Sequence, residues 1–308
     1  MRSIIATWRR FWFAPQSTST VAVWRVAFGL VVLAWAIALA PDLFAFFSAH
    51  GLLSEQPAGL PWGLLRWLPS DAALITAYAV LLLASVCLTA GYHSRLASLL
   101  VFVGVLSFQE RNPFVFNSGD LVIRDIAFYI LLAPTGAALS LDRWRTARDR
   151  FWECPARAPW ALRLMQIQLS VIYLAAAWWK VRGEVWRNGT AVSYALRLTD
   201  MLRFPVPSLL TDNMLAASLL TYGTMALELT LGILIWNRRL RPAVLVAGVL
   251  FHLAIDYAFL VGFFSFAMLV CYTVFISPEW LDARLARLRW RLESEATRIV
   301  APGPGAGW

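Results

Sequence analysis

The sequence predicts an all-α fold: a polytopic helical membrane protein with about eight transmembrane helices. Hydrophobic residues make up 60% of its 308 residues and charged residues only 15%, and the mean hydropathy is +0.63. Soluble globular domains carry about 25% charged residues. Apolar runs long enough to cross a bilayer recur along the chain, with short arginine clusters between them. The composition excludes a soluble protein and indicates a multi-pass protein of the cell (plasma) membrane, with the lipid bilayer as its main partner.

The first apolar run, 21–40, is predicted to be a transmembrane helix and not a cleaved signal sequence. It spans a full bilayer, exceeds the apolar region of a secretory signal, contains Arg25 and precedes Pro41. Breaks in the later apolar sequence predict seven further spans: 72–91, 95–109, 120–135, 160–180, 214–236, 242–259 and 262–277. The third and fourth spans are short and carry charge, so we expect them to be tilted, shielded by neighbouring helices or partly re-entrant.

The placement of arginine predicts the orientation of these spans. Arginines cluster before the first span, between the fourth and fifth, between the sixth and seventh, and after the last. In the long connections 41–71 and 181–213 arginines are more widely spaced. Because cytoplasmic loops carry the excess of Lys and Arg, both termini are predicted to be cytoplasmic. This asymmetry accounts for the net charge of +9, and we expect no nucleic-acid partner.

The chain is predicted to divide into a membrane domain, 1–280, and a cytoplasmic tail, 281–308. The tail carries four leucines near helical spacing with arginines between them: Leu281, Leu285, Leu288 and Leu292. This pattern is typical of an amphipathic helix on the anionic inner leaflet. Residues 302–307 are almost all Pro and Gly, and we expect them to be disordered.

Lys180 is the only lysine among the 27 Lys and Arg residues of the chain. It ends an apolar run, 171–180, at the predicted extracytoplasmic end of the fifth span. Arginine keeps its proton in a protein, whereas a lysine in apolar surroundings can lose it near neutral pH. Lys180 is therefore a candidate base, and the alternative is a cation that extends to the lipid headgroups.

A line of polar residues runs along the same span. Gln166, Tyr173 and Lys180 are each seven residues apart, so they share one helical face, and Ser170 lies on that face too. Such a line is costly against lipid, and we expect it to face a cavity lined by protein. The alternative is a seam of hydrogen bonds between helices.

Two further groups of ionisable residues lie inside predicted spans. Asp120 and Arg124 are four residues apart and can pair on one helical face. His252 and Asp256 have the same spacing, so that the carboxylate can orient the imidazole, and Glu228 lies in the preceding span. Intramembrane ionisable residues are candidates for function, with a structural ion pair as the alternative.

No metal site is predicted. The spacing of His252 and Asp256 fits two metal ligands, but the sequence offers no evident third or fourth. The three cysteines are scattered without a metal-ligand spacing: Cys87, Cys154 and Cys271. Arg25 is expected to neutralise Glu228 or Asp256, or to extend towards the inner surface.

Several motifs resemble a known family of membrane proteins. They are Tyr173-x6-Lys180 followed by Trp186 and Gly189; Glu228; His252; the run 262–269 with Ser277-Pro278-Glu279-Trp280; and Arg111, Pro113, Gly119 and Asp120. Together they resemble the membrane domain of vitamin K-dependent γ-glutamyl carboxylase, and more closely its bacterial relatives, the HTTM (horizontally transferred transmembrane) family. The resemblance covers most of residues 20–280.

The resemblance implies that Lys180 acts as a base toward a quinol, menaquinol or vitamin K hydroquinone, in oxygen-dependent chemistry of a carboxylase or oxidoreductase type. Tyr173 and His252 are expected to act with it. The residues expected to contact the cofactor are Gln166, Ser170, Trp179, Trp186, Asp120, Arg124 and Glu228. The chain has Gly119 where the carboxylase has a functional histidine, and it ends at Trp308 without the large extracytoplasmic domain. We therefore do not expect carboxylation of a propeptide-bearing protein.

Two alternative functions fit the same sequence. One is a non-enzymatic membrane accessory factor for maturation of a secreted peptide, with that peptide or a co-expressed membrane protein as its partner. The other is a small proton-coupled transporter in which Glu228, His252 and Asp256 form a proton relay.

Overall fold

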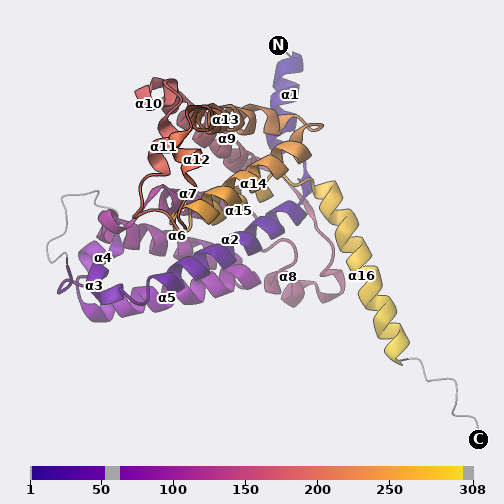
Figure 1. Cartoon of the computed structure of the whole chain (residues 1–308). Helices are drawn as coiled ribbons and strands as arrows, with labels where there is room; N and C mark the ends of the chain where they lie inside the picture. The colour runs from indigo at the N-terminus through magenta and orange to yellow at the C-terminus, as the bar shows by residue number, and fades with distance from the viewer. Residues whose placement is uncertain (1, 53–62, 301–308) are drawn as a thin grey trace, which may run out of the picture.

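The computed structural model describes residues 2–52 and 63–300, which are almost entirely helical (Figure 1). Eight helices cover the eight predicted spans: α2 (Ser19–Ala38), α5 (Asp71–Ala90), α6 (Ser94–Arg111), α7 (Ser118–Leu131), α9 (Trp160–Arg182), α13 (Met214–Ile233), α14 (Arg241–Ala258) and α15 (Phe264–Thr273). The prediction of an all-α fold is confirmed.

Shorter elements connect and flank these helices. They are α1 (Arg2–Phe13), α3 (Leu43–Phe47), α4 (Leu64–Trp67), η1 (Pro113–Val115), α8 (Leu141–Thr146), η2 (Arg148–Arg150), α10 (Glu184–Arg187), α11 (Ala191–Ala195), α12 (Ser208–Asp212), η3 (Leu234–Trp236) and α16 (Pro278–Val300). Two short strands, β1 (Gln16–Ser17) and β2 (Ala156–Arg157), pair antiparallel and tie the start of α2 to the segment before α9.

Five helices among the described residues are long and apolar enough to cross a membrane: α2, α5, α9, α14, and α13 continued through η3. A sixth span is obtained if α15 and α16 count as one, although their axes differ by 88°. These helices make the chain a membrane protein, as predicted. The count of eight spans stays a prediction, because α7 has only 14 residues and α15 only 10.

Contacts between helix ends show that α2 and α7 run in opposite directions, and so do α9 and α15. Arg25, near the start of α2, donates hydrogen bonds to the carbonyls of Thr135 (3.0 Å) and Leu139 (2.6 Å), beyond the end of α7. Gln166, near the start of α9, donates to the carbonyl of Val274, beyond the end of α15 (2.6 Å). The expectation that Arg25 neutralises Glu228 or Asp256 is therefore wrong.

The two ends of the helix bundle differ in charge. We call one the arginine-rich end, because α8, η2 and the starts of α9 and α14 place their arginines there: Arg143, Arg145, Arg148, Arg150, Arg163, Arg238 and Arg241. The other, the Lys180 end, holds α3, α4 and α10 to α12 (Figure 1). This separation accords with the predicted orientation, which stays a prediction.

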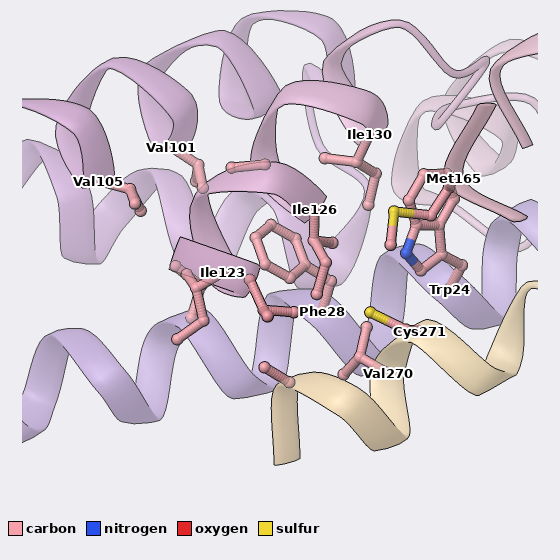
Figure 2. Close-up of a cluster of buried hydrophobic side chains, with 14 of the residues drawn as sticks. Trp24, Phe28, Val101, Val105, Ile123, Ile126, Ile130, Met165, Val270 and Cys271 are labelled. Carbon is pink, nitrogen blue, oxygen red and sulfur yellow. The ribbon is translucent and has the colours of Figure 1, made fainter. Parts of the chain in front are cut away.

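One face of helix α7 is packed inside the bundle, whereas Leu121 and Phe128 on the opposite side are exposed. Ile123, Ile126 and Ile130 are fully buried. Figure 2 shows them packed among side chains that include Phe28 of α2 and Cys271 of α15. The charged residues of α7 bond to neighbouring helices, Asp120 to Trp35, Asp125 to Gln168 and Arg124 to Glu110, although the Arg124 side chain is 31% exposed. Neighbouring helices thus shield part of this segment, as expected, and its tilt or re-entry in the membrane stays a prediction.

Helices α1 and α16 lie at the arginine-rich end and extend away from the bundle (Figure 1). α16 covers most of the predicted amphipathic tail. α1 was not predicted, although Ile4, Ile5 and Trp8 form an exposed apolar face beside Arg9 and Arg10. Both helices have the character of helices that lie in a membrane surface. The segment 302–307, expected to be disordered, is outside the described residues.

Asp142, in the first turn of α8, fastens the connection between α5 and α6. Its carboxylate accepts hydrogen bonds from the backbone N–H of His93 (2.8 Å) and from the N–H (2.8 Å) and hydroxyl (2.7 Å) of Ser94. Burial opposes ionisation, but these hydrogen bonds outweigh it and lower the pKa of Asp142 below its usual value.

We predict that Asp142→Asn removes part of the acid sensitivity of the fold. A carboxylate with a lowered pKa stabilises the folded state above its unfolded pKa of about 3.9, and this contribution is lost as pH falls through the folded value. Thermal unfolding in detergent should show wild type losing stability below about pH 4 more steeply than the variant. Asp149→Asn, at an exposed position, is the matched control. Equal pH dependence in both variants would contradict the prediction.

Candidate functional site

Lys180 forms an ion pair with Glu228 between two packed helices. Its Nζ, in the last turn of α9, donates to Oε1 of Glu228 in α13. The Glu228 side chain is only 7% exposed and that of Lys180 20%. Trp186 of α10 covers the pair, with its ring centroid 4.9 Å from Nζ. The alternative in which Lys180 extends to the headgroups is therefore wrong: its amine is paired inside the protein.

A second buried group lies further along α9. The Tyr173 hydroxyl is 2.8 Å from Nε2 of His252 in α14 and also hydrogen-bonds the hydroxyl of Tyr272 in α15. All three residues are at most 4% exposed. Three helices thus bring an imidazole and two phenols into one continuous hydrogen-bond network.

These two groups form one site, which we call the α9 cluster: Tyr173, Lys180, Glu228, His252 and Tyr272. Tyr173 and Lys180 are separated by two helical turns, about 10 Å along the axis. The Glu228 carboxylate lies within electrostatic range of both phenols. The cluster therefore combines an amine, a carboxylate, an imidazole and two phenols in a buried region.

Two atoms of the α9 cluster have no hydrogen-bond partner among the described residues. They are Oε2 of Glu228 and Nδ1 of His252, and both are buried. A buried polar atom without a partner costs about 1–3 kcal/mol. Such an atom in a native structure suggests a water, an ion or a ligand group as its partner. The cluster thus retains hydrogen-bonding capacity for a polar guest molecule.

The first half of the polar line on α9 is a seam between helices. Besides its bond to Val274, Gln166 accepts a hydrogen bond from Arg163 (2.8 Å). Ser170 accepts one from the indole N–H of Trp236 (2.8 Å). Trp179 lies outside the cluster: it is 68% exposed, and the guanidinium of Arg182 is 5.9 Å from its ring. Of the expected cofactor contacts on α9 and α10, only Trp186 lies beside the amine.

Asp120 and Arg124 do not form the predicted pair. Asp120 caps α7 by accepting hydrogen bonds from the backbone N–H of Asn117 and the indole N–H of Trp35, both at 2.7 Å. Arg124 pairs instead with Glu110 of α6 at 3.1 Å. The capping geometry turns the carboxylate back towards the helix start, away from the following turn. Both residues are engaged in structural contacts.

Asp256 does not orient His252, as the spacing predicted. Arg203 approaches Asp256 instead: its Nη2 is 4.0 Å from the carboxylate, and its Nε donates to the backbone carbonyl (3.1 Å). The partner of the imidazole is Tyr173, seventy-nine positions earlier in the chain. Across residues 2–52 and 63–300, no three His, Cys, Asp or Glu side chains are arranged to hold a metal ion.

Tyr272 and Gly248 belong to the site but were not identified from the sequence. A Cβ atom at position 248 would lie 2.6 Å from the Tyr272 hydroxyl, so the absence of a side chain makes room for this phenol one turn before His252. Tyr272 lies within an apolar run, where a buried tyrosine hydroxyl needs a partner. This need for a partner is the sequence signal that could have identified Tyr272 as a member of the site.

Gly119 is required by a close approach of α7 to α15. A Cβ atom there would lie 2.5 Å from Cα and 2.7 Å from the backbone nitrogen of Phe264. Because backbone atoms cannot move aside as a flexible side chain can, this packing excludes any larger residue. A histidine at position 119, as in the carboxylase, is incompatible with this arrangement of helices.

We predict that Gly248→Ala destabilises the protein by about 1–3 kcal/mol, the usual cost of overpacking. Helix propensity alone predicts the opposite, because alanine in place of glycine inside a helix raises the free energy of unfolding by about 1 kcal/mol. Gly223→Ala in α13 is the control, because nothing lies within 4 Å of a Cβ at that position. Thermal unfolding in detergent should show a lower melting temperature for Gly248→Ala only. Equal effects of the two substitutions would disprove the close contact with Tyr272.

The comparison with known families agrees with the motifs noted in the sequence. A family model described as HTTM domain matches residues 13–280, a range that includes every residue of the α9 cluster. No solved structure matches this chain. The match is consistent with a relationship to the membrane domain of the carboxylase. The chain is a membrane protein that belongs to the HTTM family.

Proposed function

We propose that this HTTM protein is an enzyme of the cell membrane in which Lys180 acts as a base toward a quinol, in oxygen-dependent chemistry on a substrate still to be identified. The observation that carries the proposal is the buried pair of Lys180 and Glu228 beside the network of Tyr173, His252 and Tyr272. Ionisable groups gathered in a poorly solvated region are characteristic of active sites.

Lys180 is the only cationic side chain in the sequence that can act as a base. Its amine can accept a proton, whereas the guanidinium of arginine stays protonated. In the ion pair Lys180 already carries a proton, so the base is the neutral amine that forms when this proton passes to Glu228; Glu228 holds the amine in place and stabilises the ammonium ion again once the amine has taken a proton from the quinol. Trp186 lies over the same nitrogen and favours its cationic form through the face of its ring.

Tyr173 connects the other two members of the network. A phenol hydroxyl both donates and accepts, so Tyr173 can pass a proton between His252 and Tyr272 without movement of the backbone. This network gives the site a second group that can hold a proton two helical turns from Lys180.

The unpartnered atoms fit the hydroxyl groups of a quinol such as menaquinol or vitamin K hydroquinone. A bound quinol supplies two electrons and two protons, which oxygen can accept. Oε2 of Glu228 can accept a hydrogen bond from a hydroxyl, and Nδ1 of His252 can accept or donate one according to its tautomer. The ring of Phe264, 5.4 Å from that of His252, adds an aromatic surface. Gln166, Ser170, Asp120 and Arg124 are engaged elsewhere, so we assign the quinol to Lys180, Glu228 and His252.

We predict that Lys180→Arg abolishes quinol oxidation by the purified protein while it keeps the positive charge beside Glu228. Loss of a general base lowers the rate by about 10²–10⁴-fold. The assay follows the appearance of quinone from menaquinol in detergent, with and without oxygen. Glu228→Gln should also lower the rate, because it removes the carboxylate that holds the amine.

A double substitution, Lys180→Arg with Arg182→Lys, is a stringent control. It keeps the composition and the net charge but moves the amine two positions along α9, to a different helical face. We expect this variant to be as inactive as Lys180→Arg, with a melting temperature close to that of wild type. Activity in the double variant, or wild-type protein that neither binds nor oxidises a quinol, would overturn the proposal and favour an accessory role.

A further inference from the structure

A cavity of about 620 Å³ lies at the arginine-rich end, where the polar line of α9 begins. It is open on one side and lined by α1, β1, η3 and the connection after it, the starts of α9, α14 and α16, and the residues that follow α15. Gln166, at the start of that line, contributes to its wall. Its volume is within the range of about 300–1,000 Å³ found for small-molecule sites. It is separate from the α9 cluster.

The wall of this cavity is strongly positive. Its charged residues are Arg163, Arg238, Arg241 and Glu279, three cations against one anion. Arg238 is close enough to Arg163 and Arg241 to repel both electrostatically. Three guanidinium groups around one hollow with a single carboxylate indicate that the complementary ligand is an anion.

Two of these arginines lie at the starts of helices, but their guanidinium groups bond to carbonyls at the carboxyl ends of α1 and η3. Arg163 is in the first turn of α9 and Arg241 is the first residue of α14. The carboxyl end of a helix favours a cation, whereas the amino ends of α9 and α14 carry partial positive charge and favour an anion. Their hydrogen-bond partners are neutral: Phe11 and Gln166 for Arg163, and the carbonyls of Ile235 and Trp236 for Arg241. A bound anion would offset this charge.

The remaining wall is apolar and aromatic, which indicates an amphiphilic ligand. Trp236, Phe275 and Trp280 line the cavity beside the arginines. The exposed apolar face of α1 lies at the same end of the bundle (Figure 1). A headgroup held here would have apolar protein surface for the start of its acyl chains.

We propose that this cavity binds the phosphate headgroup of an anionic phospholipid. Arginine binds phosphate through charge-assisted, often bidentate hydrogen bonds, and Arg163, Arg238 and Arg241 offer three such groups. The predicted orientation places the cavity at the inner leaflet, whose surface is anionic. The ligand would hold α1 and α16 against the starts of α9 and α14.

The test compares two neighbouring arginines. Arg238 lines the cavity, whereas Arg239 is also exposed but does not line it. Binding is measured by native mass spectrometry and by thermal stabilisation of detergent-purified protein with phosphatidylglycerol, phosphatidylcholine or inorganic phosphate. We expect phosphatidylglycerol alone to bind and stabilise wild type and Arg239→Gln. Arg238→Gln should bind it about tenfold more weakly, the effect of losing one charge-assisted hydrogen bond.

Several outcomes would overturn the proposal. Equal weakening by Arg238→Gln and Arg239→Gln would show non-specific attraction to a basic surface. Equal binding of phosphatidylcholine would remove the requirement for an anion, and full stabilisation by inorganic phosphate would identify a site for free anions. Lys180→Arg should bind phosphatidylglycerol like wild type, so the result is independent of the proposed enzyme function. If Arg238→Gln unfolds without lipid, Trp280→Ala on the exposed rim is the second variant, with the same expected loss.

Discussion

Polar groups in this protein lie among apolar helices, and a bilayer gives them no water to bind. A polar group there is costly unless it has a partner on its own helix, on another helix or in a bound molecule. The ion pair of Lys180 and Glu228 meets this requirement, and so does the contact of Tyr173 with His252 and Tyr272. These contacts fix how α9, α13, α14 and α15 lie against one another, so the same interactions hold the bundle together and form the candidate site.

Close packing of helices is the second condition for this site. Gly248 lets α14 approach the phenol of Tyr272, and Gly119 lets the start of α7 meet the backbone of α15. With α15 held from both sides, the tyrosine hydroxyl is fixed within reach of Tyr173. The second approach leaves no space for a side chain at position 119, because the neighbouring backbone of Phe264 occupies it. A quinol site here would therefore depend on Glu228 and His252 for the contacts that remain available.

The two ends of the bundle have different chemistry, although one helix connects them. α9 carries Arg163 and Gln166 beside the basic cavity and Lys180 beside Glu228 at its other end. Between them, Ser170 and the bond from Trp236 continue the polar line as a seam. The proposed lipid site would anchor the bundle in the membrane, and the α9 cluster would transfer protons.

The sequence by itself determined the membrane class, the helical segments and the membership of the HTTM family, because apolar length and local motifs are properties of continuous segments. It also selected Lys180, Tyr173, Glu228 and His252. Only the tertiary structure decided their partners, since these residues lie 48 to 99 positions apart from the groups they contact. Spacing on one helix suggested Asp120 with Arg124 and Asp256 with His252, but the Asp120 carboxylate caps α7 and the Asp256 carboxylate lies 4.0 Å from Arg203. Local periodicity predicts the helical face on which a side chain lies. The packing of other helices determines which groups the side chain contacts there.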